Sequence, residues 1–248
     1  MEALSLVGKI YLTKNYGSVS VLAVDSARKV YVKFLNTGYE VCTTKQHLLQ
    51  GNIKDRLAPS VYGVGVVGDH TTKQDGVHVP EYVIWRHMLQ RCYDQRTQSL
   101  NPAYKGCSVS PNFQNYGYFK SWCNEQVGYG NPNFQIDKDL LVKGNKIYSE
   151  ATCAFVPCEI NSLCRSHAKR GAYPVGVSFD KDFKKFSAKI LRLGKSETLG
   201  HFYTSEQAFE VYKRSKEAQI KELANKWKSQ IDKRVYDALI AWEVVECD

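Results

Sequence analysis

A short polar run, Asp137-Lys138-Asp139, ends an apolar segment that has the composition of a β-strand. Asn161 follows in a later segment whose pattern predicts a helix. Carboxylate and amide oxygens are hard ligands that suit Mg²⁺, an ion that proteins commonly hold together with a phosphate. Such an ion stabilises the charge that develops during phosphodiester cleavage. If one strand carries both aspartates, its two-residue period points Asp137 and Asp139 to the same side.

The elements that position these residues form a compact unit. The segment IDKDLL predicts a strand, and a turn follows at Gly144-Asn145. TCAFV predicts a second strand, and a helix begins at Pro157. The order strand, turn, strand, helix therefore fits within residues 134–165.

The segment FQIDKDLLVKGNKIYSEATCAFVPCEINSL resembles phage HNH-type endonucleases of the ββα-metal fold. The earlier segments MLQRCYD, SVSPNF and YFKSW extend the resemblance over residues 82–166. The resemblance implies that Asp137 and Asn161 bind Mg²⁺ or Mn²⁺. Asp139 can join them if it lies on the same strand as Asp137.

Two positions depart from that family. The family has a histidine that activates water where this chain has Lys138, and an asparagine where it has Thr152. A lysine has a pKa near 10.4, so it needs a large depression to act as a base at neutral pH. His167 is another candidate base. Two interpretations stay open: Lys138 binds the scissile phosphate in an active site, or the run 137–139 is a solvated strand end in a nuclease that only grips DNA.

A second pattern lies between residues 173 and 217. YPVGVSFDKDFKKFSAKI and the residues up to Phe202 predict three short strands with alternating apolar side chains. Thr204 and Gln207 form a capping box that predicts the start of a helix. Phe209 and Tyr212 turn inward on that helix.

These motifs resemble the ethylene-response (APETALA-type) DNA-binding domain, which also occurs in mobile endonucleases of phages. The matching elements are GVSF, FSAKI, LGHF and residues 206–212. In that family the three-stranded sheet lies in the major groove. The resemblance implies a DNA-facing set consisting of Lys181, Lys184, Lys185, Lys189, Arg192 and Lys195. The alternative is a basic sheet face that is merely solvated.

Charge and composition agree with a polyanionic partner. The net charge is +9 with a pI near 9.0. Residues 165–199 hold nine basic and three acidic side chains, so most of the excess lies in this stretch, which includes the predicted strands of the second pattern. No apolar run is long enough to span a membrane, and the N-terminus has no basic segment of a secretory signal. We therefore expect a cytoplasmic protein with no membrane partner, in the host cell if a phage encodes it.

The sequence predicts an α+β, multi-domain chain. The predicted parts are a small Src-homology-type β-barrel (1–60), a linker (61–79), the HNH-like ββα-metal domain (80–166), the ethylene-response-type domain (170–217) and a long C-terminal helix (218–248). An apolar stripe on that helix favours either core packing or binding of another copy or protein.

The function that these patterns favour is a homing-like DNA endonuclease that nicks or cleaves double-stranded DNA with a divalent metal. A catalytically degenerate DNA-binding regulator is one alternative, and a protein-interaction module is another. Basic charge and tyrosines do not separate DNA from RNA.

Overall fold

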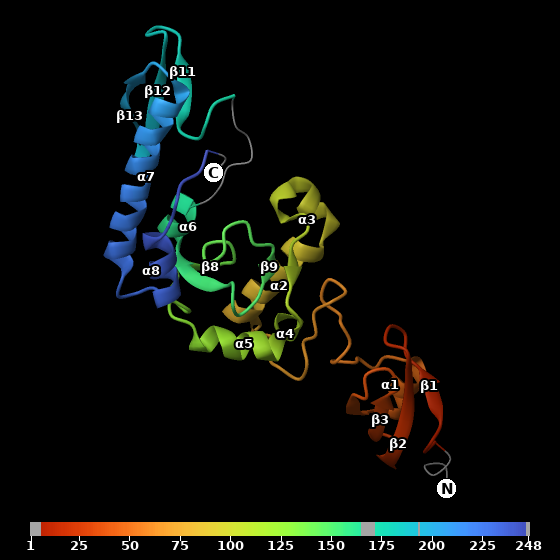
Figure 1. Ribbon diagram of the computed structural model, residues 1–248. Helices are drawn as coiled ribbons and strands as arrows, with labels where there is room; N and C mark the ends of the chain where they lie inside the picture. Colours follow the sequence, from red (N-terminus) through yellow and green to blue (C-terminus); the bar gives the residue numbers. More distant parts are fainter. Residues whose placement is uncertain (1–5, 165–171, 193, 247–248) are drawn as a thin grey trace. The chain divides into compact units, whose positions relative to one another are not determined.

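A computed structural model describes residues 6–164, 172–192 and 194–246 (Figure 1). The fold is mixed α+β, as predicted. The chain divides into two compact units: residues 1–100 with 109–121, and residues 101–108 with 122–248. The predicted domain boundaries follow composition and motifs instead, and they remain predictions. No helix in the described ranges combines the length and apolarity needed to cross a bilayer.

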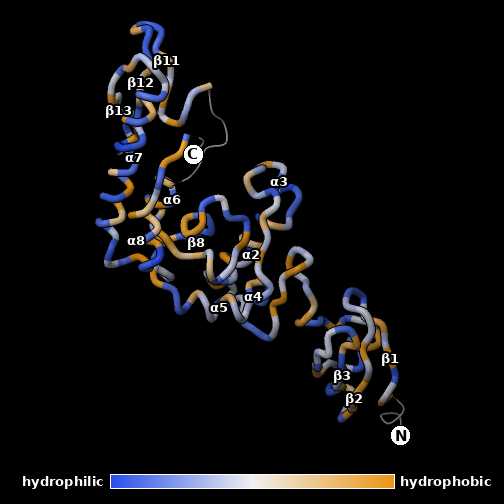
Figure 2. Tube along the Cα trace, in the orientation of Figure 1, coloured by the Kyte–Doolittle hydropathy of each residue, from blue (hydrophilic) through white to orange (hydrophobic). Residues whose placement is uncertain are grey.

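The first unit begins with a four-stranded antiparallel meander. Its strands are β1 (Ile10–Leu12), β2 (Ser18–Ser26), β3 (Lys29–Phe34) and β4 (Glu40–Thr43), in that order across the sheet. Alternation along β3 buries Val30, Val32 and Phe34 on one face, where Leu48 of α1 (Lys45–Gln50) covers them. Apolar and polar residues alternate along these strands in Figure 2.

The predicted closed barrel is wrong. Within the described strands, β1 pairs only with β2 and β4 only with β3. Thr44 caps α1 directly after β4, so the chain forms a helix where a closing strand would have to lie. The Lys14 N–H donates a backbone hydrogen bond, 3.0 Å long, to the Gly51 carbonyl. This bond joins the end of α1 to the turn that follows β1.

The rest of the first unit combines an irregular segment with a short hairpin and several helices. It contains β5 (Lys73–Gln74), β6 (Val77–His78), α2 (Pro80–Tyr93), α3 (Gln95–Leu100) and α4 (Pro111–Gln114). Trp85 of α2 is fully buried, and its Nε1 donates to the carbonyl of Phe113 at 2.7 Å. A Cβ added at Gly65 would lie 2.5 Å from Leu89, so this part of the predicted linker is packed against α2. The elements β7 (Ser108–Val109) and α5 (Tyr116–Glu125) have residues in both units.

The second unit contains the two patterns that the sequence singles out. In chain order its elements are the 3₁₀ helix Pro102–Tyr104, β8 (Phe134–Asp137), β9 (Ile147–Tyr148), β10 (Ala154–Pro157), α6 (Cys158–Cys164), β11 (Val177–Asp180), β12 (Lys185–Arg192), β13 (Lys195–Phe202), α7 (Ser205–Trp227) and α8 (Lys233–Ile240). The strands β8 and β10 pair antiparallel, and α6 follows at once. We call β8, β10, α6 and the loop between the strands the finger.

The predicted three-stranded sheet and its helix are both present. β12 lies between β11 and β13, with all pairs antiparallel. The Thr204 hydroxyl accepts from the N–H of Gln207, which is the predicted cap of α7. The predicted single C-terminal helix is wrong, because α7 ends at Trp227 and Asp232 caps a second helix.

A hydrophobic core joins the finger, the sheet and the two C-terminal helices. It joins Val156 and Ile160 of the finger to Ile190 of the sheet and to Phe209 of α7. Leu239 of α8 lies in the same core, so the apolar stripe packs within the chain, which is one of the two interpretations that the sequence favoured. The finger and the sheet are therefore parts of one folded body.

Candidate active site and nucleic-acid interface

Asp137 is the last residue of β8, where it lies opposite Ala154 of β10. Its Oδ1 accepts the backbone N–H groups of Asp139 at 2.8 Å and Leu140 at 2.7 Å. Its Oδ2 makes no hydrogen bond within the part of the chain that the structure describes. Burial raises the pKa of the Asp137 carboxyl, although the two N–H groups oppose that rise.

The same bonds correct the prediction for Asp139. A side chain that accepts the N–H groups two and three residues ahead folds the backbone into a turn, and the strand ends there. Asp139 is therefore not on a strand with Asp137, and the two-residue period does not apply. Its carboxylate instead forms an ion pair with the ammonium group of Lys138 and is about half exposed.

Lys138 is buried, with 7% of its surface exposed. Its Nζ donates to the carbonyl oxygen of Asn145 at 2.9 Å and to the carboxylate of Asp139. The ring of Tyr148 lies below it, with its centroid 5.7 Å from Nζ. These contacts hold the ammonium group inside the loop, and they stabilise the conformation of that loop.

Asn145 closes the loop from the other side. Its amide nitrogen donates to the carbonyls of Lys138 at 2.8 Å and Ile147 at 2.7 Å. Thr152, which stands where the family has an asparagine, donates to the same Ile147 carbonyl at 2.7 Å. Both side chains therefore form hydrogen bonds with backbone carbonyls of the loop. His167, the other candidate base, lies outside the described residues.

Asn161 lies on α6, next to Ile160, which is fully buried in the core. The helix is fixed to α7 by Glu159, whose carboxylate accepts from Lys226 Nζ at 2.7 Å and from the indole of Trp227. Phe134 of β8 packs edge-on against Trp227, with ring centroids 5.6 Å apart. Residues of α7 therefore contact both α6 and β8, the two elements that carry Asn161 and Asp137.

Asp137 and Asn161 both carry side-chain oxygens, the ligand type of hard divalent cations. Asp137 has one carboxylate oxygen without a hydrogen bond, and Asn161 supplies an amide oxygen. No group of three His, Cys, Asp or Glu side chains gathers in the described ranges. Mg²⁺ commonly binds through one or two carboxylates and completes its shell with water and phosphate oxygens. Burial raises the pKa of the nearby Cys153 thiol to about 12, so it stays neutral and is a poor metal ligand.

The predicted DNA-facing residues do not lie on one surface. Alternation along β12 buries Ala188 and Ile190 against α7, so Lys185 points from the opposite face, whereas Lys189 lines a cavity that α7 also borders. The Nζ of Lys185 lies 4.5 Å from the ring centroid of Tyr203. Lys181 and Lys184 are exposed in the turn between β11 and β12, which forms the hydrophilic tip of the sheet in Figure 2.

Arg192 and Lys195 are paired across the other end of the sheet. The Arg192 guanidinium donates to the Ser215 hydroxyl of α7 at 3.0 Å and lies 3.5 Å from Glu197, so it points to the helix side. Arg192 and Lys189 border a cavity of about 870 Å³ whose other walls come from α6, α7 and the segment 242–244.

Two exposed aromatic residues beside the lysines were not predicted as contacts. Tyr203 is 79% exposed, and Phe183 is 63% exposed with its ring 4.3 Å from that of His201. The alternation of basic and aromatic residues in DFKKF was the signal for Phe183. His201 is in turn 3.3 Å from Asp180, so the tip is a linked group of side chains.

Comparison with known proteins adds no family. No family model, no curated protein and no solved structure matches this chain.

Proposed function

We propose that this chain is a phage-type DNA endonuclease that nicks or cleaves double-stranded DNA with Mg²⁺ or Mn²⁺. The observation that carries the proposal is the position of Asp137. It ends the first strand of a two-stranded hairpin that leads directly into the helix bearing Asn161. A half-buried carboxylate with one oxygen left for another ligand is what a metal-dependent phosphodiesterase needs there.

In this proposal Asp137 and Asn161 hold the cation, which stabilises negative charge on the phosphate when it is bound. The N–H groups of Asp139 and Leu140 fix the orientation of the Asp137 carboxylate. Lys138 keeps the loop closed and adds positive potential beside the phosphate. A bound cation would favour the charged form of the Asp137 carboxylate, and so would offset the free-energy cost of ionising this half-buried group.

The three-stranded sheet supplies affinity for DNA. Lys185 lies on the face away from α7, and Lys181 and Lys184 are exposed in the adjacent turn between β11 and β12. Lysines bind phosphates, which position a protein on a duplex without reading its sequence. The shared core fixes this face relative to the finger, so DNA bound on the sheet meets the finger in a defined orientation.

A second candidate, DNA binding without cleavage, rests on one observation. The Lys138 ammonium, at the position of the family's base, is engaged by Asp139 and the Asn145 carbonyl. A general base must reach the proton that it removes. In the second candidate the finger retains its fold and its phosphate contact but hydrolyses nothing.

The test compares nicking of supercoiled plasmid by the full chain in Mg²⁺, in Mn²⁺ and in EDTA. Asp137→Asn removes the charge while its amide oxygen can still accept the two N–H groups of the turn. Asp182→Asn, in the exposed β11–β12 turn, is the control with the same charge change. Metal-dependent nicking that Asp137→Asn abolishes and Asp182→Asn retains supports the endonuclease.

DNA binding measured on the same proteins separates the two candidates. Salt-sensitive binding without nicking in either metal rejects the endonuclease and supports the DNA-binding regulator. Absence of both activities rejects both candidates.

A further inference from the structure

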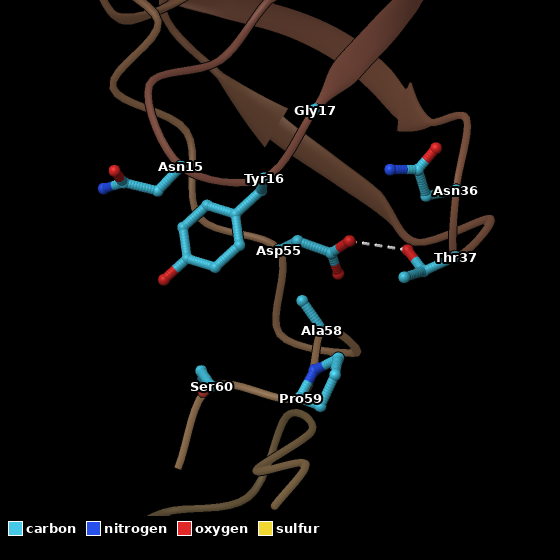
Figure 3. Close-up of a pocket in the computed structure, with 9 residues that line it drawn as sticks. All are labelled: Asn15, Tyr16, Gly17, Asn36, Thr37, Asp55, Ala58, Pro59 and Ser60. Carbon is cyan, nitrogen blue, oxygen red and sulfur yellow. Dashed lines mark hydrogen bonds between the residues drawn. The ribbon is translucent and has the colours of Figure 1, made fainter. Parts of the chain in front are cut away.

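A cavity of about 540 Å³ lies in the first unit, beside the N-terminal sheet (Figure 3). Its walls come from the turn at residues 15–17, the turn at residues 36–37, and the segment from Asp55 to Ser60. Figure 3 shows the ring of Tyr16 beside Asp55, with Ala58, Pro59 and Ser60 across from it. This volume lies within the range of small-molecule and side-chain sites in proteins.

Asp55 is the unusual member of this wall. Only 1% of its surface is exposed, yet its carboxylate accepts hydrogen bonds from neutral donors, the Thr37 hydroxyl at 2.7 Å and the Leu57 N–H at 2.9 Å. The adjacent Arg56 pairs with Asp69 instead, at 3.6 Å. No ion pair to Asp55 forms within the described part of the chain. A buried carboxylate without a cationic partner is rare, because burial of an unpaired charge is costly.

The chemistry of the wall selects the sign of the ligand. No lysine, arginine or histidine lines the cavity, although the chain as a whole carries a charge of +9. A phosphate or a carboxylate would therefore meet only Asp55 as a charged group, with repulsion.

The wall also selects the kind of cation. A metal ion such as Mg²⁺ or Ca²⁺ needs about six or more oxygen ligands, and this cavity has a single carboxylate. Tyr16 adds an aromatic ring, and Asn15, Asn36 and Ser60 are the uncharged polar residues of the wall. A ring beside a carboxylate matches guanidinium or alkylammonium, which bind through charge and through the ring face.

We infer that this cavity binds an organic cation, a guanidinium or ammonium group such as the side chain of arginine or lysine. Asp55 supplies the opposite charge, and Tyr16 supplies the ring. The site is separate from the residues of the proposed nuclease and does not depend on that function. Its ligand comes either from a basic segment of a partner protein or from a free small molecule, and the experiment below distinguishes these sources.

The test uses the full chain without DNA and isothermal titration with three ligands. These are acetyl-Gly-Arg-Gly-amide, the same peptide with neutral citrulline in place of arginine, and free arginine amide. We expect the arginine peptide to bind at least about tenfold more tightly than the citrulline peptide, since a close charge pair gives this much coupling. Binding of the cation should weaken as salt rises.

Two substitutions test the assigned residues. Asp55→Asn should raise the dissociation constant at least about tenfold, and Tyr16→Leu, which keeps an apolar contact with Phe34, should raise it severalfold. Asp25→Asn, an exposed residue of β2, is the matched control and should change it less than about twofold. Melting temperatures check that each variant is folded.

Equal binding of the arginine and citrulline peptides overturns the inference. So does unchanged affinity in both the Asp55→Asn and Tyr16→Leu proteins. If the peptide binds more tightly than free arginine amide, the natural ligand is a segment of a partner protein. If the two bind equally, the cation alone is recognised and a small molecule is the source.

Discussion

The Nζ of Lys138 lies 2.9 Å from the backbone carbonyl oxygen of Asn145, across the loop that joins β8 to β9. The amide of Asn145 returns the contact by donating to the carbonyl of Lys138 at 2.8 Å. The two residues are thus joined twice, once through each side chain. This reciprocal pair explains how a buried lysine is tolerated beside a candidate metal ligand, since its ammonium group is hydrogen-bonded and faces a carboxylate.

The first prediction concerns this contact. Lys138→Met keeps the length of the side chain but removes the ammonium group, which leaves the Asn145 carbonyl without its donor. We expect the free energy of unfolding of the second unit to fall by about 1–3 kcal/mol, the usual cost of losing a charged hydrogen bond in a buried place. Urea denaturation followed by tryptophan fluorescence measures it.

Lys181→Met is the control for the first prediction, because Lys181 is exposed in a turn and makes no contact of this kind. Its effect should stay within about 0.5 kcal/mol. Equal stability of the Lys138→Met and wild-type proteins would show that the loop does not depend on the ammonium group.

The second prediction concerns the base that the proposed endonuclease lacks. Lys138→His restores the residue type of the resembling family beside Asp137. A positioned general base contributes about 10²- to 10⁴-fold to a rate, so even an imperfectly placed imidazole should raise metal-dependent nicking at least about tenfold. Plasmid nicking in Mg²⁺ at an assay condition of about pH 7.5 measures this gain. That pH lies above the ordinary histidine pKa of about 6.5.

The double variant Asp137→Asn, Lys138→His is the control for a gain of nicking, since it has the base without the carboxylate ligand. A gain that survives in the double variant would mean that the added histidine works without the proposed metal site. No gain in the folded single variant, at unchanged DNA affinity, would argue that the finger binds DNA without hydrolysing it.

The third prediction separates the two ends of the three-stranded sheet. Lys185 lies on the face away from α7, whereas Lys195 is paired with Arg192 at the end that reaches back to that helix. Lys185→Ala should weaken binding to duplex DNA and lower the slope of log affinity against log salt by about 1, because one phosphate contact is lost. Lys195→Ala should leave the slope unchanged.

Fluorescence anisotropy at several salt concentrations measures both slopes in the third prediction. An RNA duplex of the same sequence shows whether the sheet distinguishes the two acids. Equal slopes in the Lys185→Ala and wild-type proteins would remove Lys185 from the DNA-binding surface.

Local patterns in the sequence were enough to predict much of the second unit. The cap formed by Thr204 and Gln207 and the alternation in β12 depend on residues close together in the chain, so the helix and sheet could be predicted. The stripe beyond Trp227 could not reveal the break before α8. Ile231 and Val235 keep apolar spacing while the chain turns between them and α7.

The candidate site was less predictable, because it depends on where side chains turn. Asp137 and Asp139 look equivalent on a strand, but the Asp137 carboxylate binds the N–H groups ahead of it and ends the strand. Lys138 looks available to a phosphate, yet its partner Asn145 is seven residues away across the loop. Sharing of one core by the finger and the sheet involves contacts over longer separations, for which periodicity carries no signal.

The last prediction concerns pH and the tip of the sheet. The Phe183 N–H donates a hydrogen bond to the Asp180 carboxylate, and the His201 ring lies beside that carboxylate. These two contacts hold the pKa of the Asp180 carboxyl below its ordinary value. A carboxyl whose pKa is lowered by folding stabilises the folded state above its unfolded pKa, near 3.9. That contribution is lost as the pH falls through the lower pKa of the folded state. The turn between β11 and β12 should therefore loosen below about pH 4.

Hydrogen exchange at the Phe183 N–H between pH 2 and 6, corrected for its intrinsic pH dependence, measures the loosening of this turn. In the Asp180→Asn protein, protection of that N–H should vary less with pH in this window, because no carboxyl titrates there. Asp182→Asn is the control, since the N–H of Asp182 donates to Asp180 while its own side chain is exposed. It should keep the wild-type pH dependence. If the Asp180→Asn and wild-type proteins show the same pH dependence of exchange, the Asp180 carboxyl does not set the stability of the turn. The next residue to substitute is His201, whose ring centroid lies 4.3 Å from that of Phe183.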